Sequence, residues 1–135
     1  MEWHDDVGTR EDLARYRIET SESDLRSARV LLEIGDFRGS NNRAYYSIFH
    51  CINAIHAISG KAYKRHKDAI SNFNKDYVRT GIFSREIGRR IAQAEEIRHA
   101  SDYDDFYLAS REEAEEQIRT AEDILVMAKR YCNID

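Results

Sequence analysis

The sequence predicts an all-α protein, namely an antiparallel four-helix up-and-down bundle with an additional short helix. Proline is absent and only six glycines occur among the 135 residues, so little in the chain interrupts long helices. Apolar residues recur at three- and four-residue steps along most of the sequence, as one buried stripe per helix requires. Helices of about 20 residues with short connections pack economically as an antiparallel bundle.

The first helix is predicted from about Thr9 to Ile34, and Gly35 ends it because glycine tolerates a left-handed cap. Its buried stripe is predicted at apolar positions that recur at helical spacing: Leu13, Tyr16, Leu25, Ala28, Leu31 and Leu32. Hydroxyl side chains at positions 20, 21 and 23 compete for backbone hydrogen bonds. The helix is therefore expected to start late or to bend near Thr20.

The second helix, from Phe37 or Ser40 to Ser59, is apolar on nearly every side, which predicts a central position in the bundle. Gly60 follows it. Three further helices are predicted from stripes and terminal signals, at about Lys67–Arg79, Ser84–Ala100 and Ser110–Tyr131. Ser110 and Glu113 have the spacing of a capping box, which opens the last of these.

Length and composition indicate a single domain over residues 1–135, with residues 1–8 flexible. The chain is 41% hydrophobic and 34% charged, which is typical of globular proteins. No stretch approaches the roughly 18 apolar residues of a membrane span, and the N-terminus lacks the pattern of a secretory signal, so we expect a cytoplasmic protein. Cys51 and Cys132 have no metal-ligand spacing, so neither a disulfide framework nor a zinc site is expected.

Charge is distributed unevenly along the sequence. The net charge is -4, yet residues 37–90 hold eleven Lys and Arg and three acids. The basic middle segment is suited to a phosphate backbone or an acidic protein. A set of solvated helix faces accounts for it equally well.

A polar stripe on the predicted second helix is the best candidate for a functional site. Arg43 and His50 are seven residues apart, which is nearly two turns, so both side chains emerge on one face. Further polar side chains lie beside them and are candidate binding residues: Asn42, Tyr46, Ser47 and Asn53. Polar groups on such an apolar helix need partners, which implies a helix interface or a site.

The stripe has the groups that metal-free RNA cleavage needs. His50 can take a proton from a ribose 2′-hydroxyl or give one to a leaving oxygen, and Arg43 can stabilise charge on a phosphate. Internal transesterification requires a 2′-hydroxyl and so excludes DNA. An Arg and a His at this spacing are a weak motif alone, because a hydrogen-bonded structural histidine and a salt-bridged arginine explain them as well.

The segments NNRAYYSIFHCINAI and SREEAEEQIRTAEDIL, together with the acidic, aromatic SDYDDFY loop, resemble the HEPN family over about Thr9 to Tyr131. Arg43 and His50 match the positions of the arginine and histidine that HEPN ribonucleases use, with a spacer of six. The resemblance implies a homodimer in which two such motifs face one cleft. It also implies a toxin paired with a minimal nucleotidyltransferase as antitoxin. From the residues themselves we expect no membrane partner, no cofactor and no metal.

The sequence departs from the family pattern at two positions. Ile52 stands where one branch carries the tyrosine that its partner modifies with AMP, and Ala44 stands where a polar residue commonly follows the arginine. Two alternatives therefore remain: a non-catalytic subunit that binds a nucleotide or a nucleotidyltransferase, and a plain helical scaffold.

Other polar residues are weaker candidates for the site. His66, in the basic KRHK segment, is a candidate phosphate contact or a surface histidine. His56 lies on another face of the second helix and is expected in the core or on the surface, and His99 is a candidate partner of Asp102 or Asp104. Asp104 and Asp105 lack a third carboxylate at helical spacing, so a solvated loop is preferred there to a magnesium site.

Overall fold

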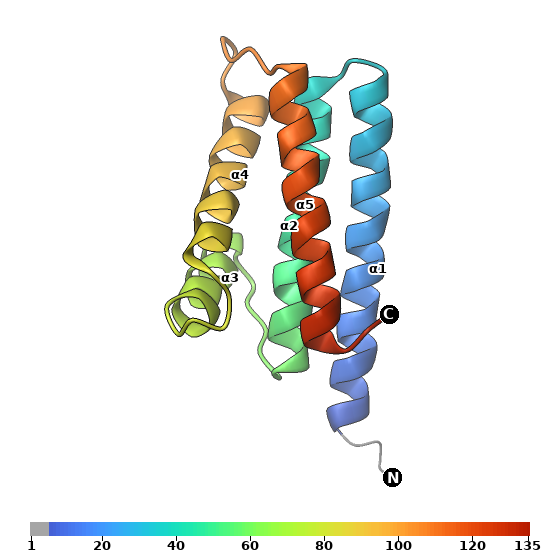
Figure 1. Ribbon diagram of the computed structural model, residues 1–135, viewed down its shortest axis with the longest axis vertical. Coiled ribbons are helices and arrows are strands. Elements are labelled where there is room, and N and C mark those ends of the chain that lie inside the picture. The colour runs from blue at the N-terminus through green and yellow to red at the C-terminus, as the bar shows by residue number, and fades with distance from the viewer. Residues whose placement is uncertain (1–5) are drawn as a thin grey trace.

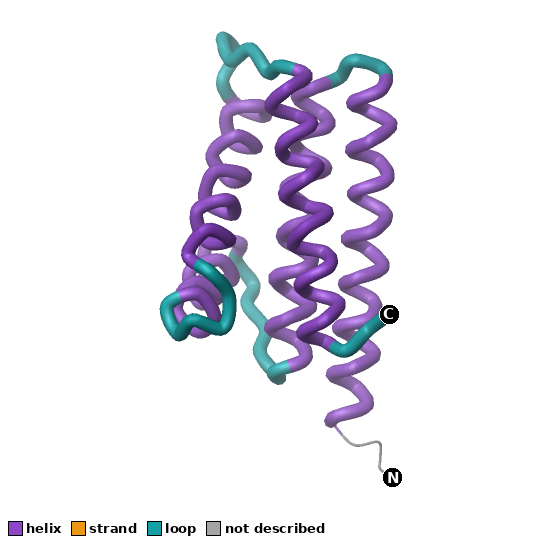
Figure 2. The backbone as a smooth tube through the Cα atoms, in the orientation of Figure 1, coloured by secondary structure: helices purple, strands orange, loops and turns teal. Residues whose placement is uncertain are grey.

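The computed structural model describes residues 6–135 and contains an antiparallel bundle of four long helices within that range (Figure 1). The bundle comprises α1 (Asp6–Glu33), α2 (Phe37–Ile58), α4 (Arg85–Tyr103) and α5 (Arg111–Cys132). The additional short helix is α3 (His66–Phe73), which continues into one π-helical turn, Asn74–Val78. The predicted fold class is confirmed, since the part of the chain that is described contains helices and loops and no strand (Figure 2).

The N-terminal helix begins before the predicted position. Residues 1–5, part of the segment expected to be flexible, lie outside the described residues, and residues 6–8 already belong to α1. None of the described helices has the length and apolar character needed to cross a bilayer.

Helix α2 lies at the centre of the molecule, as predicted, and packs against α1, α3, α4 and α5. Figure 1 shows it behind α5, with α1 and α4 on either side. Its side chains are buried on most faces, including Tyr45, Ile48, Ile52 and Ile55 at 1% exposure or less. Any polar side chain on α2 therefore either has a partner inside the bundle or lies on the narrow part of its surface that stays open.

Helix α1 is continuous, so the expected late start or bend near Thr20 is wrong. Thr20 Oγ1 donates a 3.0 Å hydrogen bond to the carbonyl of Tyr16, one turn earlier in the same helix. Ser21 Oγ donates a 2.8 Å bond to the carbonyl of Ser47 on α2. Both hydroxyls thus find acceptors while the backbone stays helical, and the helix gains a tie to its neighbour.

The buried stripe of α1 differs from the predicted one in its first half. Leu13 and Tyr16 are 38% and 63% exposed, whereas Ala14 and Ile18 are buried. Small residues recur every seven positions on the buried face, at Ala14, Ser21 and Ala28. Small side chains at a helix contact allow the two backbones to approach, and this places the polar groups of α1 close to those of α2.

The ends of the helices follow the sequence signals. Gly35 and Gly60 have positive φ angles of 84° and 78°, which end α1 and α2 as predicted. Ser84 Oγ accepts from the backbone N–H of Ile87, and Ser110 Oγ accepts from that of Glu113 at 3.1 Å. The Glu113 carboxylate accepts a 3.3 Å bond from the buried Asn41 Nδ2, so it ties α5 to α2.

His56, for which the sequence left core and surface open, is buried between α2 and α3. Its Nε2 lies 2.9 Å from the carbonyl oxygen of Ala69, and aromatic rings of Tyr63, Phe73 and Tyr77 surround it. Its Nδ1 is buried without a partner in the described part of the molecule. Burial lowers the pKa of His56, so the folded protein holds this ring in the neutral form.

The unfolding free energy is expected to fall as the pH drops through about 6.5. In that range the histidine of an unfolded chain binds a proton more readily than His56 does in the folded protein, so low pH favours the unfolded chain. Burial also lowers the pKa of His50 and His66, which adds to the loss in the same direction. Urea unfolding of His56→Gln should therefore show a flatter pH dependence between about pH 7 and 5. The exposed His99→Gln is the matched control. Equal slopes for wild type and His56→Gln would contradict this account.

Candidate functional site

Arg43 and His50 lie together on α2 and share one carboxylate, Asp24 of α1. Arg43 Nη1 is 3.0 Å from Asp24 Oδ1, and His50 Nε2 is 3.5 Å from Asp24 Oδ2. The side chains are 37%, 24% and 13% exposed for Arg43, His50 and Asp24. The structure therefore brings the two candidate catalytic residues together at a site that solvent reaches.

Sequence reasoning missed Asp24, because the register between α1 and α2 cannot be read from either helix alone. A signal was nonetheless present. Arg17 and Asp24 are seven residues apart on α1, the same spacing as Arg43 and His50 on α2. Two antiparallel helices that each carry polar residues two turns apart can bring both pairs to one surface, and Arg17 lies near enough to lower the pKa of His50.

A second set of contacts holds Arg43 from the α4 side. Arg43 Nε donates to Asn42 Oδ1 at 2.9 Å, and Asn42 Nδ2 donates to both oxygens of Asp102 at 2.9 and 3.2 Å. Asp102 also lies 3.5 Å from Arg98 Nη1. The guanidinium carbon of Arg43 is 4.9 Å from the centre of the Tyr46 ring. The guanidinium is thus held on both edges and over one ring, so its direction is set before any ligand binds.

The surroundings of His50 favour one neutral tautomer. Its Nδ1 is buried and has no hydrogen-bond partner among residues 6–135, while Nε2 faces Asp24. A proton on Nε2 can be donated to Asp24, whereas a proton on Nδ1 would be a buried, unmet donor. Burial lowers the pKa of His50; Asp24 opposes this, and Arg17 and Arg43 add to it. Proton transfer at Nε2 therefore requires a ligand to take the place of Asp24.

His66 joins the same region from the start of α3. Its ring stacks on Phe49 with centroids 3.8 Å apart and meets Tyr46 edge-on at 5.6 Å. Its Nδ1 lies 3.5 Å from the Tyr45 hydroxyl, and burial raises the pKa of Tyr45 to about 12. The phenol keeps its proton and can donate it to Nδ1, which leaves the N–H of His66 on Nε2.

The other candidate binding residues are placed differently. Ser47 is fully buried, and its Oγ is 2.9 Å from Ser21 Oγ inside the contact of α1 with α2. Ser47 is therefore a packing residue and does not line the site, which corrects its assignment as a binding residue. Asn53 is half-buried one turn beyond His50, and its binding role stays a prediction.

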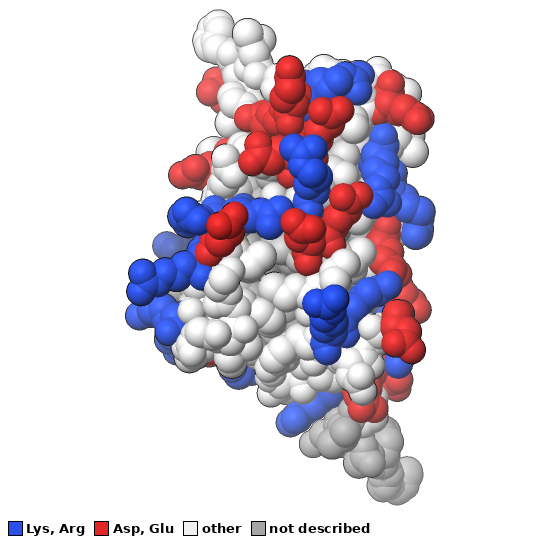
Figure 3. Space-filling view, viewed as in Figure 1, with Lys and Arg blue, Asp and Glu red and all other residues white. Residues whose placement is uncertain are grey.

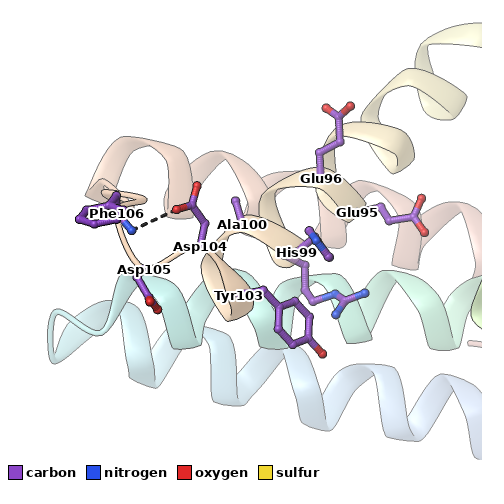
Figure 4. Close-up of a pocket in the computed structure, with 9 residues that line it drawn as sticks. Glu95, Glu96, His99, Ala100, Tyr103, Asp104, Asp105 and Phe106 are labelled. Atoms are coloured by element: carbon purple, nitrogen blue, oxygen red, sulfur yellow. Dashed lines mark hydrogen bonds between the residues drawn. The ribbon is translucent and has the colours of Figure 1, made fainter.

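The acidic, aromatic loop beyond α4 borders an open cavity of about 780 Å³, which Arg98 also lines (Figure 4). Asp104 Oδ1 accepts a 3.0 Å hydrogen bond from the backbone N–H of Phe106, so this carboxylate caps the turn of its own loop. No group of three His, Cys, Asp or Glu side chains placed to hold a metal ion occurs among the described residues.

Fold and site together define a small helical-bundle protein with an arginine and a histidine two turns apart on its central helix. The model of the HEPN domain matches residues 14–131. The chain belongs to the HEPN family, as its sequence resemblance indicated.

Two curated proteins and one solved structure are similar to this chain along most of its length. A UPF0332 protein of Thermotoga maritima is 27% identical over 88% of this chain and 90% of its own length. A Methanocaldococcus jannaschii protein that bears the name "Putative toxin" is 27% identical over 84% of this chain and 78% of its own length. The crystal structure of TT1696 from Thermus thermophilus covers 87% of this chain and 97% of its own with a TM-score of 0.73 and 20% identity, which shows a shared fold.

Proposed function

We propose that this protein is a HEPN toxin-like, metal-independent endoribonuclease of the cytoplasm that uses Arg43 and His50 at a homodimer cleft. The observation that supports the proposal most is that both side chains contact Asp24 at a solvent-accessible surface. The toxin-like role is supported by the family and by the name of the Methanocaldococcus relative. A minimal nucleotidyltransferase is the proposed antitoxin.

The proposed reaction is an internal transesterification of RNA. The ribose 2′-oxygen attacks the adjacent phosphorus and loses its proton to a base, while the bond from phosphorus to the 5′-oxygen breaks and that oxygen gains a proton. The products are a 2′,3′-cyclic phosphate and a 5′-hydroxyl. Arg43 binds the phosphate and stabilises its growing negative charge, and His50 moves the proton.

The geometry adds one requirement to this proposal. Because Asp24 lies 3.5 Å from His50 Nε2, the substrate has to displace it from that nitrogen, whereas Asp24 keeps its bond to Arg43 Nη1 and so holds the guanidinium in place for the phosphate. In a homodimer cleft, two His50 side chains supply the base and the acid separately, one from each protomer. Tyr46, Asn42 and His66 border the same surface and are the proposed contacts for the rest of the nucleotide.

The experiment that tests the proposal is incubation of purified protein with single-stranded RNA in the presence of a metal chelator. We expect cleavage of the RNA and none of a DNA strand of the same sequence, because the DNA lacks the attacking hydroxyl. Intact RNA under these conditions, or equal cleavage of both strands, would contradict the proposal.

A second function is favoured by one observation, the burial of His50 Nδ1 with no hydrogen-bond partner among the described residues. In that state the lone pair on Nδ1 is buried, and Nε2 faces Asp24 at 3.5 Å. A non-catalytic HEPN subunit that binds a nucleotide or a nucleotidyltransferase accounts for such a ring. It predicts tight binding of that partner together with no RNA cleavage.

A further inference from the structure

The loop between α4 and α5 carries two large apolar side chains that are almost completely exposed. Phe106 is 93% exposed and Leu108 is 91% exposed. Figure 4 shows Phe106 at the far end of this loop, beyond Asp104 and Asp105. We name Asp104, Asp105, Phe106 and Leu108 the acidic knob. Fully exposed apolar side chains beside charged ones are typical of protein interaction sites.

The acidic knob is held in place by an arginine at the start of α2. Arg38 of α2 donates hydrogen bonds to the backbone carbonyls of Ser101 and Asp104, both at 2.9 Å, and to that of Tyr107. The one partly buried guanidinium thus contacts three carbonyls across the base of the loop. A loop that is already ordered loses little conformational entropy when its tip binds, which favours docking.

An apolar cavity lies at the other end of the bundle, between α5 and the turn that precedes α4. Its volume is about 400 Å³, and its lining is mainly apolar: Ile82, Phe83, Val126, Met127 and Tyr131, with Asp123 and Arg130. Ile82 and Val126 are 52% and 50% exposed, so the cavity is open to a partner. Figure 1 shows the knob loop and this turn at opposite ends of α4.

Arginines lie in this cavity and on the segments beside it. Asp123 is neutralised by Arg90 at 2.9 Å, while Arg130 lines the cavity and Arg79 and Arg85 lie exposed at the ends of the adjoining turn. Figure 3 shows an uncharged area in the lower half of the view with Lys and Arg on both sides. An apolar opening edged by arginines is suited to an aromatic side chain that has carboxylates beside it.

We propose that the acidic knob of one copy of this chain inserts into the basic-rimmed cavity of a second copy. The two surfaces lie on one chain and are complementary in charge and in apolar character, which is the reason to assign a second copy as the occupant. Because they are different surfaces, the contact is head-to-tail and can continue from copy to copy. Arg43, His50 and Asp24 belong to neither surface, so this contact is independent of the proposed ribonuclease function.

The association is concentration-dependent, and high salt weakens it by screening its charges. Light scattering on the purified wild-type chain is expected to show a mass that rises with protein concentration and falls at high salt. A mass that changes with neither would overturn the proposal.

Two variants make the test specific. A knob variant, Phe106→Ser with Leu108→Ser, keeps the cavity, and a cavity variant, Val126→Glu, keeps the knob but places a carboxylate where Asp104 and Asp105 would approach. All three positions are at least half-exposed, so both variants should fold, which circular dichroism checks. Arg130→Glu on the rim is a second cavity variant if Val126→Glu is unstable.

Each variant alone is expected to lose this association by about tenfold or more in affinity. An equimolar mixture is expected to regain one knob-to-cavity contact, giving a capped complex that does not extend with concentration. If either variant associates as the wild type does, or if the mixture regains nothing, the second copy is not the occupant and the proposal is overturned.

Discussion

Replacing His50 with alanine is expected to reduce the rate of RNA cleavage by about 10²- to 10⁴-fold, because the ring is the proposed carrier of the proton in the reaction. The side chain is only partly buried, so the bundle should remain folded. The measurement is single-turnover cleavage of single-stranded RNA in chelator, with circular dichroism as the check of folding.

The matched control for this experiment is His99→Ala. His99 is an exposed histidine on α4 whose ring lies 5.0 Å from that of Tyr103. The control is expected to cleave RNA at the wild-type rate. If His50→Ala and His99→Ala cleave equally well, the proposed role of His50 is wrong.

Replacing Asp24 with asparagine is expected to reduce cleavage by about 10²-fold, the effect of misplacing reacting groups by a small distance. The substitution keeps the shape of the side chain and removes the charge that holds Arg43 and His50 together. Asp24 is also the one group that raises the pKa of His50, whereas burial, Arg17 and Arg43 lower it. The pKa of His50 should therefore fall further, and the acidic limb of the rate profile should move to lower pH.

That pH shift separates positioning from a merely structural role. Asp12→Asn is the matched control, since Asp12 is an exposed carboxylate on the same helix. It should change neither the rate nor the profile. If Asp24→Asn cleaves RNA faster than the wild type, Asp24 restrains the site. If the rate is unchanged, Asp24 plays no part in the reaction. Either result would contradict its role as a positioning residue.

The helices and their ends could be predicted because the signals that set them are local. Ser84 and Ser110 act on an N–H only three residues away, and Gly35 and Gly60 end helices through their own backbone angles. The central place of α2 was also predictable, because a helix that is apolar on nearly all sides can be stable only with neighbours around it.

The packing of α1 could not be predicted in the same way. Apolar size alone favours Leu13 and Tyr16 as buried residues, yet the contact with α2 selects Ala14 and Ile18. The choice depends on how closely two backbones approach, which is a property of the pair of helices. Ser47 was misassigned for a related reason, since its partner Ser21 lies 26 positions earlier in the chain.

The candidate site could be predicted only in part. Periodicity alone places Arg43 and His50 on one face of α2, and both side chains do contact the same residue, Asp24. Asp24, Asp102 and Arg98 come from two other helices, so their presence depends on the tertiary arrangement. The burial of His50 Nδ1 is likewise a consequence of packing.

The most direct measurement of the central claim is the chemical identity of the cleaved RNA ends, determined on reactions in chelator. An attack by the ribose 2′-oxygen leaves a 2′,3′-cyclic phosphate and a 5′-hydroxyl, and a 2′-O-methyl group at the cleavage position should block it. We predict these ends and this block if Arg43 and His50 catalyse the transesterification. A 5′-phosphate with a 3′-hydroxyl would show that water is the nucleophile and would contradict it.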